Sequence, residues 1–257
     1  MGFDVAADAY ERFMGAYAAQ LSPQLADLAE VRPKQRALDV GCGPGALTGE
    51  LVERLGPGAV AAVDPSAPFV AAVRERLPGV EASVAAAEAL PFDDGAFDVV
   101  LAQLVVAFMT DPVAGLREMR RVTRPAGVTA ACVWDHAGHQ APLTVFWRAV
   151  ASIDPDARDE SDLAGARDGH LVELFRTAGL REIEDTALPA RVDHASFEAW
   201  WEPYTLGVGP AGAYVAGLDG ARRAQLRDRC RELLPEARFT LAARAWAARG
   251  RPPPAPA

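Results

Sequence analysis

The chain has 257 residues, of which 50% are hydrophobic and 24% charged, and its formal net charge is −9 at pH 7. This composition is typical of a globular protein large enough to bury a substantial core. The acidic balance argues against a nucleic-acid partner, because nonspecific affinity for nucleic acid depends on clustered Lys and Arg. No apolar run approaches the roughly 20 residues of a membrane-spanning helix, so we expect no membrane association.

The N-terminal stretch MGFDVAADAYERF has acidic residues where a secretory signal has basic ones, and it lacks a continuous apolar segment. We therefore expect a cytoplasmic protein. The three cysteines, Cys42, Cys132 and Cys230, lie far apart and form no metal-ligand pair. They predict free thiols and no metal site.

Residues 1–34 are expected to form a helical lid segment that covers a ligand. A short helix within the first twenty residues would carry Tyr10, Phe13, Met14 and Tyr17. The next stretch, SPQLADLAEV, offers Ser22 as an N-cap and Pro23 at the first helical position. This pattern predicts a second helix that begins at Ser22.

Five short apolar runs alternate with helix-period segments between residues 36 and 135. The runs are RALDV (36–40), AVAAVD (59–64), VEASVA (80–85), FDVVLA (97–102) and VTAACVWD (128–135). Helical apolar stripes between them are formed by Leu47, Leu51 and Leu55, and by Val113, Leu116, Met119 and Val122. The alternation predicts a parallel, doubly wound α/β sheet, with residues 35–135 as its core.

The pattern changes after residue 135. We predict a helix near 142–151, an acidic loop at 154–169, a helix within 170–180, a strand near 181–192, a Gly-rich turn at 206–212, a helix near 219–234 and a strand around 238–248. Residues 136–248 are assigned to completing the sheet and to acceptor specificity. The closing RGRPPPAPA (249–257) has the composition of a disordered tail.

A glycine-rich loop, D-x-G-x-G-x-G-A from Asp39 to Ala46, stands at a predicted junction of strand and helix. Gly41 and Gly43 let the backbone approach a ligand without obstruction by a Cβ atom, and the helix beyond offers unpaired N–H groups. Asp64, at the end of the second predicted strand, suits the two hydroxyls of a ribose. The loop also satisfies the dinucleotide pattern G-x-G-x-x-[GA], so these residues indicate an adenosine-type cofactor and leave its identity open.

Four segments together carry a more specific resemblance: ALDVGCGPGALT, AVDPS, AEALPFDDGAFDVV and REMRRVTRPAGVTAACVWD. In order and spacing, the chain resembles the class I S-adenosylmethionine-dependent methyltransferases over about residues 35–135, in the small-molecule branch that includes the ubiquinone and menaquinone biosynthesis enzymes. The resemblance implies a Rossmann-like, mostly parallel seven-stranded sheet with helical lid insertions. It also implies S-adenosyl-L-methionine as cofactor and in-line transfer of its methyl group to a small-molecule acceptor.

The resemblance also implies roles for single residues. The glycine loop would hold the methionine portion of the cofactor, with Asp39 near its ammonium, while Asp64 takes the ribose hydroxyls and Gln103 faces the sulfonium. Because Ala86 stands where many relatives have Asp, adenine recognition must use the backbone or Glu88. The predicted cofactor-binding set is Tyr17, Asp39, Gly41, Cys42, Gly43, Asp64, Pro65, Ala87, Glu88 and Gln103.

Asp135, His136 and His139 follow the fifth predicted strand, at the edge where ligands bind in open α/β sheets. Histidine titrates near neutrality, which makes His139 or His136 a candidate general base if the acceptor must lose a proton early. The alternative is that these residues only complete a turn. The aromatic residues Trp200, Trp201 and Tyr204 are candidates for lining an acceptor pocket or for ordinary core packing.

Two other functions stay open at this point. One is an NAD(P)-dependent reductase, although a short-chain reductase needs a Tyr-x-x-x-Lys pair and Lys34 is the only lysine of the chain. The other is a protein that binds S-adenosylmethionine without catalysis, because methyl transfer needs no diagnostic catalytic residue.

Overall fold

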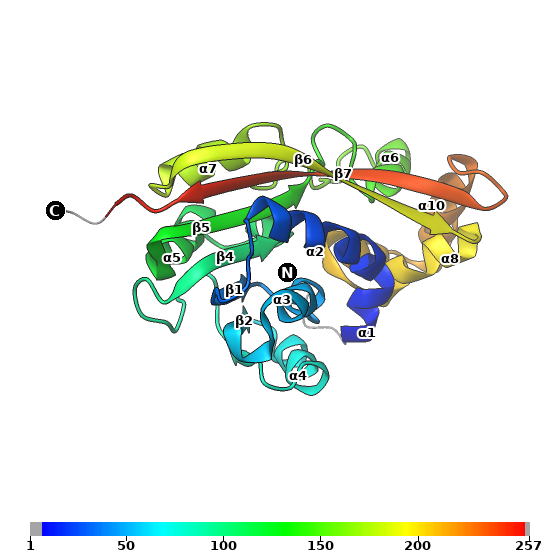
Figure 1. Ribbon diagram of the computed structural model, residues 1–257. Helices are drawn as coiled ribbons and strands as arrows, with labels where there is room; N and C mark the ends of the chain where they lie inside the picture. Colours follow the sequence, from blue (N-terminus) through cyan, green and yellow to red (C-terminus); the bar gives the residue numbers. More distant parts are fainter. Residues whose placement is uncertain (1–6, 255–257) are drawn as a thin grey trace.

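A single seven-stranded sheet organises the computed structural model, which describes residues 7–254 (Figure 1). The strand order is β3-β2-β1-β4-β5-β7-β6. The strands are β1 (Ala37–Val40), β2 (Val60–Asp64), β3 (Glu81–Val84), β4 (Phe97–Gln103), β5 (Thr123–Trp134), β6 (Arg181–His194) and β7 (Phe239–Arg251).

Strands β1 to β5 run parallel to one another, and β7 pairs antiparallel with both β5 and β6. The prediction of a mostly parallel, seven-stranded, Rossmann-like sheet is therefore confirmed. The order reverses beside β1, which has β2 on one side and β4 on the other. Such a switch point leaves a crevice at the carboxyl ends of the strands, where ligands bind in open α/β sheets.

Helices cover both faces of the sheet because successive strand residues point to opposite sides. Leu38 and Val40 pack with the residues of α5 (Pro112–Val122) and α7 (His170–Thr177), whereas Ala37 packs with α2 (Ala16–Leu28) and α3 (Ala46–Leu55). Helix α4 (Ala67–Arg76) packs on Ala62 of β2, on the same side as α2 and α3. The two predicted apolar stripes face the core on α3 and α5, where all their residues are buried except Leu55 and Val113, which are partly buried.

A third group of helices gathers beyond the carboxyl ends of β4 and β5, at the right of Figure 1. It consists of α1 (Ala7–Tyr10), the π-helical turn η1 (Glu11–Gly15), α6 (Thr144–Ile153), α8 (Phe197–Trp201), the 3-10 turn η4 (Glu202–Leu206), α9 (Gly209–Ala216) and α10 (Gly220–Glu232). Two further 3-10 turns lie between a helix and a strand: η2 (Pro57–Ala59) between α3 and β2, and η3 (Val106–Phe108) between β4 and α5. Phe146 of α6 stacks on Tyr204 of η4 with ring centroids 4.7 Å apart, so aromatic packing joins this group together.

The prediction that a helix begins at Ser22 is wrong, because α2 runs without interruption from Ala16 to Leu28. Ser22 is buried, and its Oγ donates a hydrogen bond to the carbonyl of Ala18, one turn earlier, rather than capping a helix. A proline inside a helix costs about 3 kcal/mol. Burial of Tyr17, Leu21 and Leu25 on one helix side outweighs that cost.

Two other predictions near the C-terminus need correction. The Gly-rich segment 206–212 is only partly a turn, since α9 begins at Gly209. The predicted tail begins too early, because β7 continues through Arg251 and pairs there with Arg181. Residues 252–254 follow the strand without regular structure, and 255–257 lie outside the described residues.

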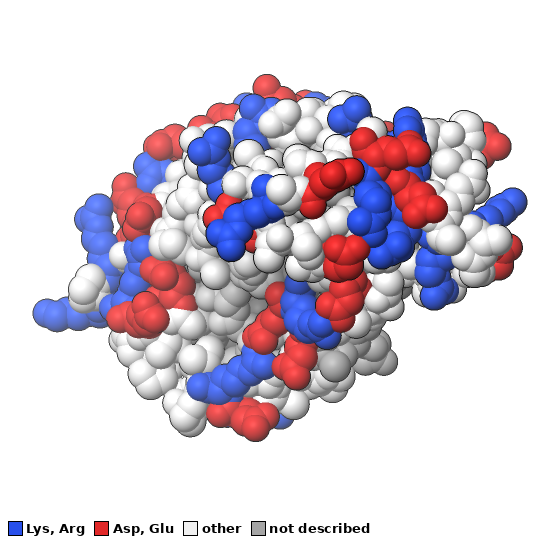
Figure 2. Space-filling view, turned by 90° about the vertical axis from the view of Figure 1, so that its right-hand side faces the viewer, with Lys and Arg blue, Asp and Glu red and all other residues white. Residues whose placement is uncertain are grey.

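Charged side chains of both signs are interspersed on the face turned to the viewer in Figure 2. The basic run 222–231 belongs to α10, where Arg227 and Arg231 both pair with Glu198 and Arg231 lies 4.3 Å from the ring centroid of Phe197. Such exposed pairs are typical of a solvated helix side. The exclusion of a nucleic-acid partner stays a prediction.

Among residues 7–254, no helix combines the length and apolarity needed to cross a bilayer.

Candidate functional site

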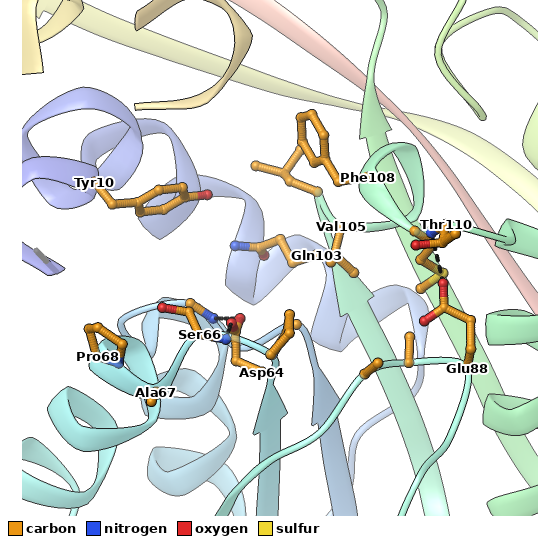
Figure 3. A pocket seen from close by; sticks show the side chains of 17 residues that line it. Tyr10, Asp64, Ser66, Ala67, Pro68, Glu88, Gln103, Val105, Phe108 and Thr110 are labelled. Carbon is orange, nitrogen blue, oxygen red and sulfur yellow. Dashed lines mark hydrogen bonds between the residues drawn. The ribbon is translucent and has the colours of Figure 1, made fainter. Parts of the chain in front are cut away.

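A pocket of about 540 Å³ opens at the carboxyl ends of β1, β2 and β4, at the switch point of the sheet (Figure 3). In the figure, Asp64 and Ser66 lie at one side, Glu88 and Thr110 at the other, and Tyr10 and Phe108 above them. We call this cavity the cofactor pocket. Of the predicted cofactor residues it is lined by Gly41, Gly43, Asp64, Pro65, Ala87, Glu88 and Gln103.

The glycine loop reaches the pocket because two of its residues adopt left-handed backbone angles. Gly41 has φ of 71° and Gly43 has φ of 51°, values that other residues rarely adopt. A Cβ atom at Gly41 would lie 2.3 Å from Cγ2 of Val105, another residue of the pocket wall. Glycine at position 41 is therefore needed both for the turn and for the close approach of β1 to the segment after β4.

Asp64 ends β2 with its carboxylate held by two backbone groups. Its Oδ2 accepts a hydrogen bond from the N–H of Gly43 at 2.9 Å, and its Oδ1 accepts one from the N–H of Ser66 at 2.8 Å. Burial raises the pKa of Asp64, and these two hydrogen bonds act in the opposite direction. The carboxylate is fixed in place and joins the glycine loop to the start of α4.

On the opposite side, Glu88 closes the pocket between two loops. Its Oε1 accepts hydrogen bonds from the backbone N–H groups of Thr110 (2.8 Å) and Asp111 (3.2 Å). Ala86 and Ala87 line the same wall and add no second carboxylate to it. The pocket thus has a largely apolar wall there, with Glu88 as its acidic group.

Tyr10 and Gln103 approach each other across the pocket (Figure 3). The Gln103 amide nitrogen donates to the carbonyl of Ala18 at 3.1 Å, which fixes its orientation, and its Oε1 is buried without a hydrogen-bond partner. The ring of Tyr10 packs edge-on against Phe69 of α4, and Arg76 of α4 pairs with Glu11. These contacts hold the N-terminal helices over the pocket.

Three residues of the predicted cofactor set do not line the pocket. Tyr17 lines a separate cavity of about 280 Å³, where its hydroxyl lies 3.4 Å from Nε2 of His194. Asp39 is fully buried beneath the glycine loop and accepts a hydrogen bond from Thr48 Oγ1 at 2.7 Å. Cys42 is buried, and burial raises the pKa of its thiol well above the ordinary value. Their contact with a cofactor stays a prediction.

The two candidate bases differ in position. His136 is 8% exposed, and burial lowers its pKa to about 4, so its imidazole is neutral at pH 7. His139 is exposed and has a left-handed φ of 55°. Both histidines line a cavity of about 90 Å³ and neither lines the cofactor pocket, but His136 also lines a small cavity that shares Tyr10, Leu104 and Phe108 with that pocket. A catalytic role for either histidine stays a prediction.

Asp135 has a structural partner that the sequence did not predict. Its carboxylate is 1% exposed, accepts from the N–H of Gly138 at 2.9 Å and pairs with the guanidinium of Arg244 on β7. The pair joins the end of β5 to the antiparallel strand beside it. The turn interpretation of the segment after β5 therefore holds for Asp135.

We expect the Arg244→Met variant to lower the free energy of unfolding by about 1 to 2 kcal/mol, because Asp135 stays buried and loses its charged partner. Urea unfolding at pH 7 measures the effect. The matched control is Arg117→Met, which removes an exposed arginine of α5. Equal stability of the two variants would show that the pair with Asp135 contributes nothing.

Several residues that follow β4 line the pocket without having been predicted from the sequence. Leu104 has a left-handed φ of 63°, unusual for a residue with a side chain, and its N–H donates to the carbonyl of Cys132 at 2.9 Å. Leu104, Val105 and Phe108 line the pocket together with Met109 and Thr110. The feature of the sequence that could have identified them is their position directly after a strand that ends at the ligand-binding edge of the sheet.

A carboxylate at the end of the second strand, a glycine loop at the first and a pocket at the switch point define a nucleoside-binding α/β protein. The model of a family described as "Methyltransferase domain" matches residues 38–131. A ubiquinone/menaquinone biosynthesis C-methyltransferase of Cupriavidus metallidurans is 33% identical over 183 residues, covering 64% of this chain and 74% of that protein. The chain belongs to the class I S-adenosylmethionine-dependent methyltransferase family.

Solved structures agree with this assignment at the level of the fold. An S-adenosylmethionine-dependent methyltransferase of Thermotoga maritima superposes with a TM-score of 0.56 at 18% identity, covering 95% of this chain and 94% of that one. A phosphoethanolamine N-methyltransferase of Haemonchus contortus, in complex with phosphomonomethylethanolamine and S-adenosylhomocysteine, gives 0.60 at 18% identity, covering 97% and 58%. The chain spans only 30% to 52% of the length of the first curated relatives it matches.

Proposed function

We propose that this protein transfers a methyl group from S-adenosylmethionine to a small-molecule acceptor. The observation that carries the proposal is the Asp64 carboxylate, fixed by the N–H groups of Gly43 and Ser66 at the edge of a 540 Å³ pocket. A carboxylate at this position can accept hydrogen bonds from both hydroxyls of a ribose. The relationship to methyltransferases supports the choice of S-adenosylmethionine over a nicotinamide dinucleotide.

The polar atoms around the pocket fit this cofactor. Ser66 Oγ and Gln103 Oε1 belong to pocket residues and are buried without hydrogen-bond partners, as is Oδ1 of Asp39 behind the loop. Buried acceptors without donors are costly, and a ligand that brings hydroxyl and ammonium donors relieves that cost. The donors of a nucleoside and of an amino acid meet this need.

The sulfonium of S-adenosylmethionine supplies a methyl group that is already activated for displacement. The protein's own part is then to align the acceptor and to keep water out. Tyr10, Leu104 and Phe108 are suited to excluding water, because they form the wall between the cofactor pocket and the cavities beyond it. Gln103, held by the carbonyl of Ala18, is suited to orienting the reacting groups at the end of β4.

We expect Asp64→Asn to weaken S-adenosylhomocysteine binding about tenfold. The carboxylate can accept hydrogen bonds from both ribose hydroxyls, whereas the neutral amide has one acceptor oxygen and accepts more weakly. Isothermal titration calorimetry on the purified chain measures the affinity. Asp228→Asn, an exposed change on α10, is the matched control and should bind as the parent does. An unchanged affinity of Asp64→Asn would remove Asp64 from the cofactor site.

Turnover is tested by following S-adenosylhomocysteine formed from S-adenosylmethionine in the presence of small-molecule extracts. We expect formation that depends on the extract and decreases in Asp64→Asn at subsaturating cofactor. Tight S-adenosylhomocysteine binding without any turnover across fractionated extracts would instead support a protein that binds the cofactor without catalysis.

A further inference from the structure

A small cavity of about 40 Å³ lies where three larger ones meet, and we call it the junction cavity. It shares Tyr10, Leu104 and Phe108 with the cofactor pocket. It shares Phe13, Met14 and Leu143 with the 280 Å³ cavity beneath α8 and η4. His136 and Glu160 line both the junction cavity and the 90 Å³ cavity beside α6. A ligand in the junction cavity would therefore contact both Glu160 and the residues that separate this cavity from the cofactor pocket.

Four aromatic rings line the junction cavity, those of Tyr10, Phe13, Phe108 and Trp134. Glu160 is the carboxylate among its lining residues and is only 4% exposed. Its Oε2 accepts a hydrogen bond from the indole Nε1–H of Trp147 at 2.8 Å. The carboxylate is thus held in place by α6, at a residue that lines the junction cavity but not the cofactor pocket.

Glu160 has no cationic side chain as a partner within the part of the chain that the structure describes. Arg148 lines the neighbouring 90 Å³ cavity, but it is exposed and forms no ion pair with Glu160 among residues 7–254. The imidazole of His136 supplies no charge at pH 7, because burial lowers its pKa to about 4. Burial also raises the pKa of Glu160 to about 7, with the Trp147 hydrogen bond acting in the opposite direction.

A buried carboxylate without a counter-charge costs several kcal/mol, and a cation delivered by a ligand offsets that cost. Aromatic faces stabilise the same cation through their quadrupoles. The two features, a buried acid without a partner and rings around the approach to it, both favour an ammonium group. A neutral hydroxyl would gain from neither the charge nor the rings to the same extent.

We propose that the methyl acceptor carries a protonated amine that binds to Glu160 in the junction cavity, with an aromatic or apolar body extending toward Leu104 and the cofactor pocket. This inference rests on the proposed methyl transfer and specifies the substrate class for it. The amine is the anchoring group of the acceptor. Glu160 is accordingly a specificity-determining residue that positions the acceptor.

The test uses the full chain saturated with S-adenosylhomocysteine and titrated with arylalkylamines from benzylamine to 4-phenylbutylamine, each compared with the alcohol of the same length. Quenching of tryptophan fluorescence reports binding near Trp134 and Trp147. We expect one or more amines to bind about tenfold more tightly than the matched alcohol, the ratio that one charge-assisted contact provides. The Glu160→Gln variant should lose this ratio while its affinity for the alcohols changes less than about twofold.

Two further variants keep the result interpretable. Glu160→Asp withdraws the carboxylate by one methylene, so the preferred amine should become longer by one methylene. Glu173→Gln removes an exposed glutamate of α7 outside these cavities and should leave the amine preference unchanged.

Equal affinity for amines and alcohols, equal weakening of both in Glu160→Gln, or no binding of any amine would overturn the proposal. S-adenosylhomocysteine binding is measured in the same samples before the titration. If that binding is intact and the amine preference is absent, only the substrate class is wrong. If the parent chain fails to bind S-adenosylhomocysteine, the proposed methyl transfer itself is wrong.

Discussion

Replacing Gly41 by alanine is expected to lower the free energy of unfolding by about 2 to 4 kcal/mol and to reduce S-adenosylhomocysteine affinity at least about tenfold. The new Cβ would lie 2.3 Å from Cγ2 and 2.7 Å from Cβ of Val105, and the residue would have to keep a φ of 71°. Either the backbone turn or the segment after β4 must shift, and both line the cofactor pocket. Thermal unfolding and calorimetry measure the two effects.

Two comparison variants separate steric overlap from backbone strain at Gly41. Gly49→Ala, inside α3 with no atom within 4 Å of the added Cβ, should leave cofactor affinity unchanged and stabilise the helix slightly. The double variant Gly41→Ala/Val105→Gly removes all three Val105 atoms that lie within 3 Å of the new Cβ and retains the strain. Measured against Val105→Gly alone, it should therefore lose less stability than Gly41→Ala loses against the parent. Parent-like stability and affinity in Gly41→Ala would contradict the close approach described for this turn.

Asp39→Asn is expected to increase the free energy of unfolding of the ligand-free protein at pH 8 by about 2 kcal/mol, with no gain near pH 4. Burial raises the pKa of Asp39 from 3.8 to about 7, against the hydrogen bond from Thr48. The folded state therefore binds this proton more tightly than the unfolded state. The neutral carboxyl of Asp39 contributes its full share to the free energy of unfolding below about pH 4, and this contribution is lost as the pH rises to about 7. Because the asparagine side chain stays uncharged, Asp39→Asn is more stable than the parent only at the higher pH.

The same change should weaken S-adenosylhomocysteine binding about tenfold at pH 8, because the proposed cofactor site has the ammonium group near this carboxylate. Urea unfolding at both pH values and calorimetry give the two measurements, with Asp228→Asn as the exposed control. An equal stability difference at pH 4 and pH 8 would show that Asp39 does not carry a buried charge. Both results together would show that Asp39 lowers the stability of the ligand-free protein and strengthens cofactor binding.

The periodicity of the sequence predicted the parallel half of the sheet closely, since strands β1 to β4 begin and end within about two residues of the predicted runs. It failed where tertiary packing overrides a local signal. Ser22 and Pro23 are a strong local start signal, yet the apolar side of α2 is buried from Tyr17 to Leu25 and keeps the helix continuous. The extension of β7 to Arg251 depends on pairing with β6, which no local pattern contains.

The candidate site was predictable where motif and strand end coincide, as at Gly41, Gly43 and Asp64. The placing of Tyr17 in a cavity apart from the cofactor pocket depends on how α2 packs across the sheet, which spacing along the chain does not specify. The burial of Glu160 could not be predicted from the sequence, because this residue lies in an acidic loop, where most carboxylates are exposed. Only the packing of that loop against Trp147 distinguishes it.

The position of β7 has a consequence for how the chain is made. β6 hydrogen-bonds to β7 and to no other strand of the described residues, and β7 is the element that follows all the others in sequence. During synthesis the fourteen residues of β6 therefore have no native strand partner until the segment up to Arg251 has left the ribosome. Pro189 and the mostly exposed side chains of β6, with their several charges, are features that discourage association of such a strand with other nascent chains.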